Sequence, residues 1–459
     1  MRSHPGARGG DLVPMREAVK AWFSISVQTF GGPAGQIAVM HRELVDGRRW
    51  IGQRRFLHAL GFCTLLPGPE AQQLAIYLGW LLNGVRGGLV AGTLFVLPGM
   101  LALLALSVLY VAAGESVLVQ ALFLGLAPAV LAIVVQAVLR VAGRALGHWS
   151  MVVVAIGTFV ALAVLAVPFP LVIAVAAIVG WALGRWAPRT VDRPLHSAVE
   201  VNATAPLLAD ESLHTQRPST GHAVRVLVLG LLAWGAPMVA VVAFTGTGSV
   251  FTQQGVFFTG TALVTFGGAY AVLAYVAQQA VDVYDWLEPG EMVDGLALAE
   301  TTPGPLIMVV QFVAFLGAYR SPGDLNPWVA AVIGALLTTW VTFVPCFVFI
   351  FLGAPYVERL RGNRSLAAAL AGITAAVVGV IANLAVYFAL HTVFERTLTW
   401  SAGPVRVELP ALDTARPVSV VIAIVAAVLM LRLRWSVPRT LGACAALGLG
   451  AGLAGLPGS

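Results

Sequence analysis

The stretch Leu66-Pro67-Gly68-Pro69-Glu70 interrupts a segment that is otherwise apolar enough to enter a bilayer, and Phe30-Gly31-Gly32-Pro33 interrupts the apolar segment before it. Proline removes a backbone donor and glycine loosens a helix, so both stretches predict broken helices. The same interruptions recur 236 residues downstream as Phe266-Gly267-Gly268 and Pro303-Gly304-Pro305. This recurrence indicates an internal repeat.

The repeat extends beyond the interruptions, because aligning 29–69 with 265–305 without a gap gives 12 identical positions in 41. Four ordinary apolar stretches follow each pair of broken segments, and one more lies between the two halves. An odd extra crossing turns the second repeat upside down relative to the first. Counted against the roughly 20 residues that a crossing needs, the nine stretches are 88–112, 117–139, 149–166, 168–187, 223–245, 327–353, 365–390, 417–433 and 438–456.

The sequence therefore predicts an all-α polytopic membrane protein made of two inverted-topology repeats with broken or re-entrant helices. Of its 459 residues, 59% are hydrophobic and 10% are charged, whereas a soluble chain carries roughly 25% charged residues. The expected parts are an N-terminal cytoplasmic extension over 1–18, a first repeat over 19–187, a cytoplasmic linker over 188–222, a connecting transmembrane helix over 223–245 and a second repeat over 255–459.

The distribution of charge predicts the orientation. Residues 41–55 hold five arginines, whereas the equivalent residues 277–291 hold four acidic residues and no base. Because short cytoplasmic loops collect Lys and Arg, the equivalent loops are expected on opposite sides, with the N terminus in the cytoplasm. Re-entrant hairpins fit this pattern better than the alternative of 13 full crossings, which places 41–55 outside.

The broken segments are also where chemistry is expected. Ionisable groups inside a bilayer are costly, and those that remain are Glu70, Glu300, His58 and Asp294, all in broken segments. The N-terminal ends of half-helices bind anions through free N–H groups, and in transporters with inverted repeats they form the substrate site. The predicted substrate-binding residues are Gly31, Gly32, Gln36, Arg42, Gly68, Gln72, Gln73, Gly267, Gly268, Gly304 and Gln311, and the prolines predicted to break helices are Pro33, Pro67, Pro69, Pro303 and Pro305.

Four side chains are candidates for proton coupling: His41, Glu43, Glu70 and Glu300. Each feature also has a purely structural interpretation. Arg42 and Glu43 could form a surface pair that anchors the chain on the cytoplasmic side, Glu70 could cap the helix after Pro69, the amides could join helices, and the glycines could serve only helix packing.

Other function classes lack their motifs. The sequence has no GxxxxGK loop for ATP, no HExxH for zinc and no GxSxG nucleophile elbow. Its three cysteines, Cys63, Cys346 and Cys444, lie in apolar runs without metal or redox spacing, so buried thiols are expected. We expect no enzyme, no metal, no cofactor and no nucleic acid as partner.

Several long motifs resemble one family. Residues 30–43 read FGGPAGQIAVMHRE, 66–75 read LPGPEAQQLA, 95–99 read FVLPG, 294–299 read DGLALA and 302–305 read TPGP. With these motifs, the sequence closely resembles the chromate ion transporters over almost its entire length.

The resemblance implies a long-chain, two-domain transporter of the inner (plasma) membrane, with oppositely oriented halves, that exports chromate, with sulfate as a competitor, and so confers chromate resistance. Membrane voltage or a proton gradient could drive the export. A carrier of sulfate or another oxyanion, a passive anion channel and a membrane scaffold remain as alternatives, and a homodimer remains open beside a monomer.

Overall fold

The computed structural model describes residues 11–30, 32–114, 116–187, 220–266, 268–354, 363–403 and 405–456. The chain divides into two compact units, and each unit combines segments from both halves of the sequence. Unit 1 consists of Met1–Leu104, Pro194–Gly268 and Thr302–Asn363, and unit 2 consists of Ala105–Arg193, Ala269–Thr301 and Arg364–Ser459.

Unit 1 is built from helices, most of which are short or interrupted. A single core joins its first-half helices to α13, through side chains such as Trp22, Phe56, Phe95 and Ile350. The helix α13 also packs against α8, α9 and α12. The elements are α1 (Met15–Gln28), α2 (Gly32–His41), the π-helical turn η1 (Arg42–Gly47), α3 (Gln53–Cys63), α4 (Glu70–Ala113, which continues into unit 2), α8 (Thr220–Thr245), α9 (Val250–Val264), the 3-10 turn η4 (Leu306–Met308), α12 (Val309–Arg320) and α13 (Pro327–Gly353).

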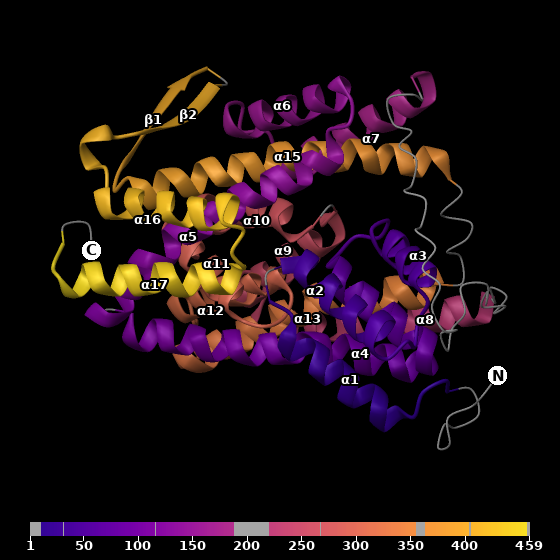
Figure 1. Cartoon of the computed structure of the whole chain (residues 1–459). Coiled ribbons are helices and arrows are strands. Elements are labelled where there is room, and N and C mark those ends of the chain that lie inside the picture. The colour runs from indigo at the N-terminus through magenta and orange to yellow at the C-terminus, as the bar shows by residue number, and fades with distance from the viewer. Residues whose placement is uncertain are drawn as a thin grey trace. The chain divides into compact units, whose positions relative to one another are not determined.

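Unit 2 is organised around two long helices, α5 and α15. In Figure 1, α15 runs beside α6 and α7, and α17 and α16 pack against α5. The elements are α5 (Val117–Ala145), α6 (Trp149–Ala163), α7 (Phe169–Trp186), α10 (Ala269–Gln278), the π-helical turn η3 (Gln279–Val283), α11 (Glu291–Thr301), α15 (Arg364–Val393), β1 (Thr397–Ala402), β2 (Val405–Pro410), the 3-10 turn η6 (Leu412–Thr414), α16 (Pro417–Ala427), the π-helical turn η7 (Val428–Arg432) and α17 (Val437–Leu453).

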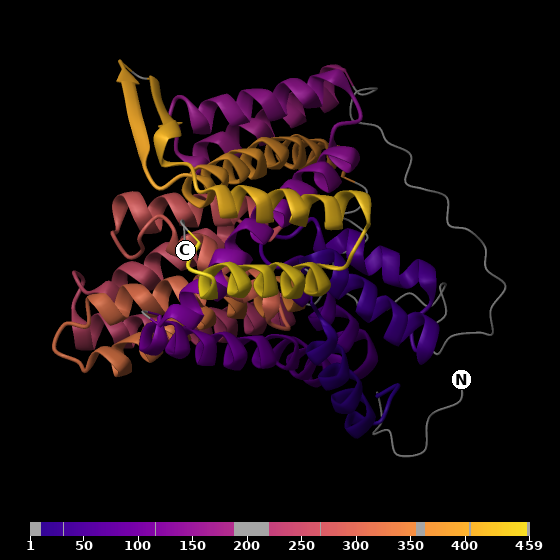
Figure 2. The same ribbon diagram turned by 60° about the vertical axis from the view of Figure 1, so that its left-hand side comes forward.

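All nine predicted spans are helical. Six of them lie in helices that are long and apolar enough to cross a membrane, and those over 149–166, 417–433 and 438–456 form shorter apolar helices. The chain is therefore an all-α, multi-pass membrane protein. The exception within the described residues is the antiparallel ribbon β1–β2, which extends from the end of α15 in Figure 2 and which the sequence patterns did not predict.

The local backbone repeats at the offset found in the sequence. Gly68 and Gly304 both have a φ of 113°, and Arg49 and Asp285 have φ values of 53° and 54°. The first broken segment is interrupted between α1 and α2, and its second-half counterpart between α9 and α10. A π-helical turn follows both α2 and α10. The two halves therefore share their irregular features as well as their apolar spans.

The two halves also agree after the Pro-Gly-Pro break. In the first half, the 44 residues of α4 are two helices that meet at a kink, with non-helical backbone at Asn83 and Gly84, where the sequence predicts the boundary between two segments. The equivalent part of the second half is divided into α12 and α13 by the loop after Arg320. The Asn83 side chain donates to the carbonyl of Val13 at 2.5 Å, which ties this kink to the segment before α1.

Close packing of α5 and α17 depends on small residues. A Cβ atom added at Gly448 would lie 2.6 Å from the Cα of Gly125, which is closer than real side chains approach backbone. Gly450, two residues further along the same helix, has open space beside it. Backbones that approach this closely are typical of helix interfaces in membranes.

We predict that Gly448→Val destabilises the purified protein, because overpacking costs about 1–3 kcal/mol. The melting temperature in a fixed detergent measures the effect. Gly450→Val is the matched control, since it makes the same change in helix propensity on the same helix. Equal melting temperatures for the two variants would contradict the packing described for α5 and α17.

Candidate functional site

The two Pro-Gly-Pro breaks are hydrogen-bonded to the other half of the sequence in a reciprocal way. The N–H of Gly68 donates to the carbonyl of Thr265 at 2.8 Å, and the N–H of Gly304 donates to the carbonyl of Thr29 at 2.9 Å. All four residues belong to unit 1. Since Gly304 is equivalent to Gly68 and Thr265 to Thr29, the two bonds are copies of each other. Such an exchange is what a two-fold relation between like parts produces.

Each break allows a helix to start inside unit 1. Helix α4 begins at Glu70, directly after Pro69, and the turn η4 begins at Leu306, directly after Pro305. The first turn of a helix leaves N–H groups without intrahelical acceptors, and the helix dipole makes this end positive. The two breaks therefore provide backbone donors that suit an anion and need no cationic side chain.

Three predicted site residues come together around these breaks as buried amides. Gln36, which is 1% exposed, donates to the carbonyl of Gly304 at 2.5 Å. Gln73 donates to the carbonyl of Pro67 at 2.5 Å. Gln311 donates to the carbonyl of Met100 at 3.1 Å. The side-chain nitrogens of these amides are therefore used in hydrogen bonds to backbone carbonyls within the breaks or near them.

Gln72 is also fully buried, and its Nε2 lies 3.5 Å from the carbonyl oxygen of Phe343. The Oε1 atoms of Gln72, Gln73 and Gln311 are buried without a hydrogen-bond partner among the described residues. Leaving a buried acceptor unsatisfied costs about 1–3 kcal/mol. Packing alone would not favour such groups, so each of these oxygens calls for a further partner.

Sequence analysis missed two members of this region. Gly99 packs against the second break, where an added Cβ would meet the carbonyl oxygen of Pro303 at 2.5 Å. Its signal was Pro98-Gly99 inside a predicted span. Gln254, on α9, is fully buried and donates to the carbonyl of Ala314 at 3.0 Å. Its signal was an amide in an apolar run.

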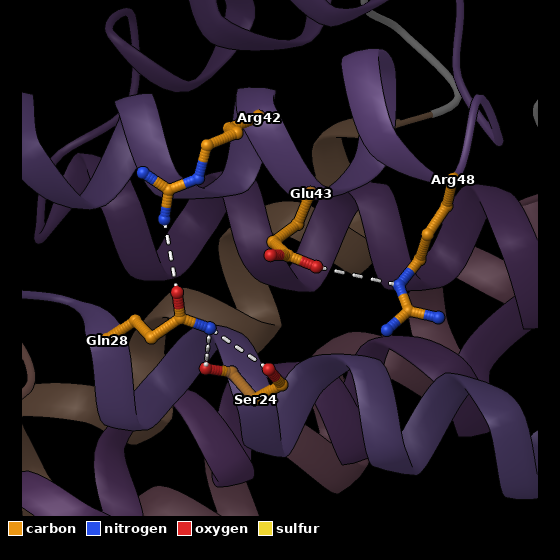
Figure 3. Close-up of polar contacts among 5 residues, drawn as sticks. All are labelled: Ser24, Gln28, Arg42, Glu43 and Arg48. Atoms are coloured by element: carbon orange, nitrogen blue, oxygen red, sulfur yellow. Dashed lines mark hydrogen bonds and ion pairs between the residues drawn. The ribbon is translucent and has the colours of Figure 1, made fainter.

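The residues that end the first broken segment lie elsewhere, on an exposed surface. Arg42 donates to the side chain of Gln28 at 3.1 Å, and Glu43 lies 3.8 Å from Arg48 (Figure 3). The ring of His41 contacts Asp46 at 3.1 Å and also Gln53. Arg42 is thus held from α1, whose Gln28 is fixed in turn by Ser24.

The remaining predicted residues are distributed as follows. Gly32 and Gly268 have positive φ at the start of α2 and just before α10. Glu70 is partly exposed on the first turn of α4. Glu300 is 1% exposed and lies in unit 2, where it accepts a hydrogen bond from Tyr270. Gly31 and Gly267 lie outside the described residues.

The described residues show no arrangement of side chains suited to a metal ion. Among the described residues, no group of three or more His, Cys, Asp or Glu side chains could hold a metal ion. The three cysteines are buried free thiols, as the sequence predicted. The broken backbone and the buried amides of unit 1 are therefore the arrangement on which a function can be argued.

The chain is similar to known transport proteins over most of its length. A family described as chromate transporter matches residues 16–181 and 252–450. A chromate transport protein of Pseudomonas aeruginosa is 32% identical, with 82% of this chain and 80% of that protein covered. A chromate transport protein of Cupriavidus metallidurans is 27% identical, with 83% and 84% covered.

No solved structure matches the chain significantly. The family assignment rests on the matches in sequence, which include both halves and the breaks within them. By these matches, the chain belongs to the chromate transporter family.

Proposed function

We propose that this chain is a secondary transporter that exports chromate across the inner membrane, with sulfate as a competing substrate. The observation that carries the proposal is the reciprocal pair of bonds, Gly68 to Thr265 and Gly304 to Thr29. The N-terminal ends of α4 and η4 and several buried amides lie together with these bonds in unit 1. Relatives named chromate transport proteins supply the substrate.

The chemistry of the site fits a tetrahedral dianion. Chromate and sulfate have similar size and charge, and a cradle of backbone N–H groups and amides recognises both. Gln36, Gln72, Gln73 and Gln311 surround the breaks, while Arg42 belongs to an exposed part of unit 1 and acts in the proposal as the cationic group that a dianion meets first. The glycines Gly31, Gly32, Gly267 and Gly268 complete the interrupted backbone.

In the proposal, protonation of Glu70 couples the binding of the anion to the movement of protons. Its carboxylate stands on the first turn of α4, where a negative charge interacts favourably with the helix dipole. A dianion at the same helix end competes with the charged carboxylate, so binding and the protonation of Glu70 depend on each other. His41 and Glu43 are candidates for carrying protons near Arg42, and Glu300 for carrying them in unit 2.

Membrane voltage favours export. An inside-negative potential is worth roughly 2.3 kcal/mol per charge per 100 mV, so about 4.6 kcal/mol drives a dianion outward. In transporters built from inverted repeats, the broken helices of the two repeats form one site that is exposed alternately to the two sides of the membrane, and we propose the same for the repeats over 19–187 and 255–459.

The direct test is uptake of labelled chromate into inside-out membrane vesicles that contain the protein. We expect saturable uptake that an imposed voltage or pH gradient increases and that excess sulfate inhibits. Uptake that stays linear in concentration would indicate a channel. Vesicles with abundant, folded protein and no uptake would contradict chromate export, and sulfate import would become the next hypothesis.

Two substitutions test the residues assigned to the site. Glu70→Gln and Arg42→Gln should abolish chromate transport and leave the amount of protein in the membrane unchanged. The matched controls are Glu17→Gln, also on the first turn of a helix, and Arg54→Gln, an exposed arginine near Arg42 in sequence. Normal transport by both site variants would remove these residues from the site.

The inverted arrangement predicts opposite accessibility of equivalent loops. In the proposed topology, cysteine at position 48 reacts only with reagents that reach the cytoplasm, and cysteine at position 285 only with reagents outside. The native thiols are buried and give a low background. Asp282→Cys is the alternative for the outer loop, because Asp285 has an unusual positive φ. Labelling of both positions from one side would contradict the inverted arrangement.

A further inference from the structure

Unit 2 contains a cavity of about 520 Å³ at one end of its helices. It is bounded by residues 120–128 of α5, by the first turns of α11 and α16, by the end of α15 and by residues 413–416. The ionisable side chains that line it are Asp294, His391, Glu395, Asp413 and Arg416. Asp413 is paired with Arg396 at 3.3 Å, and the remaining lining groups are two carboxylates, one arginine and one histidine, so nothing here favours a dianion, whereas Asp294 and Glu395 suit a small cation or a proton.

One partly buried and one buried polar group distinguish this cavity from a solvated rim. The carboxylate of Asp294 accepts a hydrogen bond from the hydroxyl of Tyr110 at 3.0 Å. Thr392 also lines the cavity, is 4% exposed, and its hydroxyl has no hydrogen-bond partner among the described residues. Buried polar atoms of this kind call for a ligand or water beside them.

The same helix carries a second carboxylate that is fully enclosed. Glu300 follows Asp294 by six residues on α11, which corresponds to a rise of about 9 Å. Its Oε1 accepts a hydrogen bond from Tyr270 at 2.5 Å, and its Oε2 is buried without a partner among the described residues. Two of the three carboxylates on α11, Asp294 and Glu300, are thus each bonded to a tyrosine from another helix.

The pairing of a carboxylate on this helix with a tyrosine has no counterpart in the first half of the sequence. At the equivalent positions of the first half, His58 stands in place of Asp294, Thr64 in place of Glu300, and Ala34 in place of Tyr270. The anion site argued above uses breaks from both halves, all within unit 1. The carboxylate pairs of α11 are therefore an addition to the repeated architecture and need a separate role.

We propose that α11 carries the proton path of the transporter, in which Asp294 takes up protons from the cavity and Glu300 holds them in the interior. The inference rests on the proposed function as a coupled exporter. Binding of a proton neutralises each carboxylate, and transfer between them requires a chain of at least two waters, because one water bridges only about 5.5 Å and the two residues are separated by about 9 Å along the helix. When both carboxylates are protonated, α11 carries no buried charge there and can move through apolar surroundings while the transporter without chromate returns to its inward-facing state. A charged carboxylate makes that movement energetically costly.

The charged and titratable groups around the two carboxylates are consistent with this role. Those around Asp294 are Tyr110 from α4, Glu291 on α11, Arg416 before α16, His391 at the end of α15, Glu395 just after it, and Asp413 in η6, which is paired with Arg396. Those that act on Glu300 are Tyr270 from α10 and Arg140 from α5. In the proposed topology the cavity opens outside, from where protons move inward as chromate leaves.

The test uses the purified full-length protein in liposomes and records chromate movement and luminal pH together. Asp294→Asn should keep the exchange of labelled for unlabelled chromate without any gradient, but should lose proton movement and stimulation by a pH gradient by a factor of about 10² or more, as for removal of a proton-transfer group. Glu288→Gln, an exposed acidic residue just before α11, is the control and should behave as the wild type. Chromate itself also binds and releases protons, but this contribution is the same for the wild type and the variants. A difference in proton movement between them therefore reports protons carried by the protein.

The outcomes separate this inference from the proposed function. A wild-type protein that exchanges no chromate would contradict the transport function itself. Normal proton movement in Asp294→Asn, or loss of gradient-free exchange in that folded variant, would overturn the role of α11. Tyr110→Phe keeps the aromatic ring and serves if Asp294→Asn does not fold. It should lower the number of protons moved per chromate, and an unchanged ratio in that variant would overturn the proposal.

Discussion

The reciprocal hydrogen bonds between Gly68 and Thr265 and between Gly304 and Thr29 are the interaction on which the rest of unit 1 depends. A broken helix leaves backbone groups that the apolar interior of a membrane protein cannot satisfy. Here each break finds its partner in the equivalent place of the other half. The φ of 113° at both glycines makes this pairing accessible, because an L side chain rarely adopts that conformation.

That pairing gives the buried amides their positions. Gln36 reaches the carbonyl of Gly304, and Gln73 reaches the carbonyl of Pro67, so part of the polar cost of each break is met by side chains from nearby helices. What remains are helix starts at Glu70 and Leu306 and several amide oxygens without partners. A site of this kind offers dipoles in place of fixed charge, and such dipoles can hold a dianion weakly enough to release it on the other side.

Much of the fold follows from local pattern, since apolar length predicts spans and Pro-Gly-Pro interrupts them wherever it falls. Partners distant in sequence do not follow from pattern. Nothing near Arg42 indicates that Gln28 would hold it on an exposed surface, and nothing near Gln36 indicates an acceptor 268 residues away. The ribbon β1–β2 was also missed, because two strands of six residues each are too short to stand out in the hydropathy of a membrane protein. Within the site, residue types were predictable, whereas their bonds were not.

The most direct measurement is the position of the chromium atom in the protein with chromate bound, located by anomalous scattering from crystals. The account places chromium in unit 1, within hydrogen-bonding reach of the helix starts that follow Pro69 and Pro305. Chromium found in the acidic cavity of unit 2, beside Asp294 and Glu395, would contradict the assignment of the breaks as the oxyanion site.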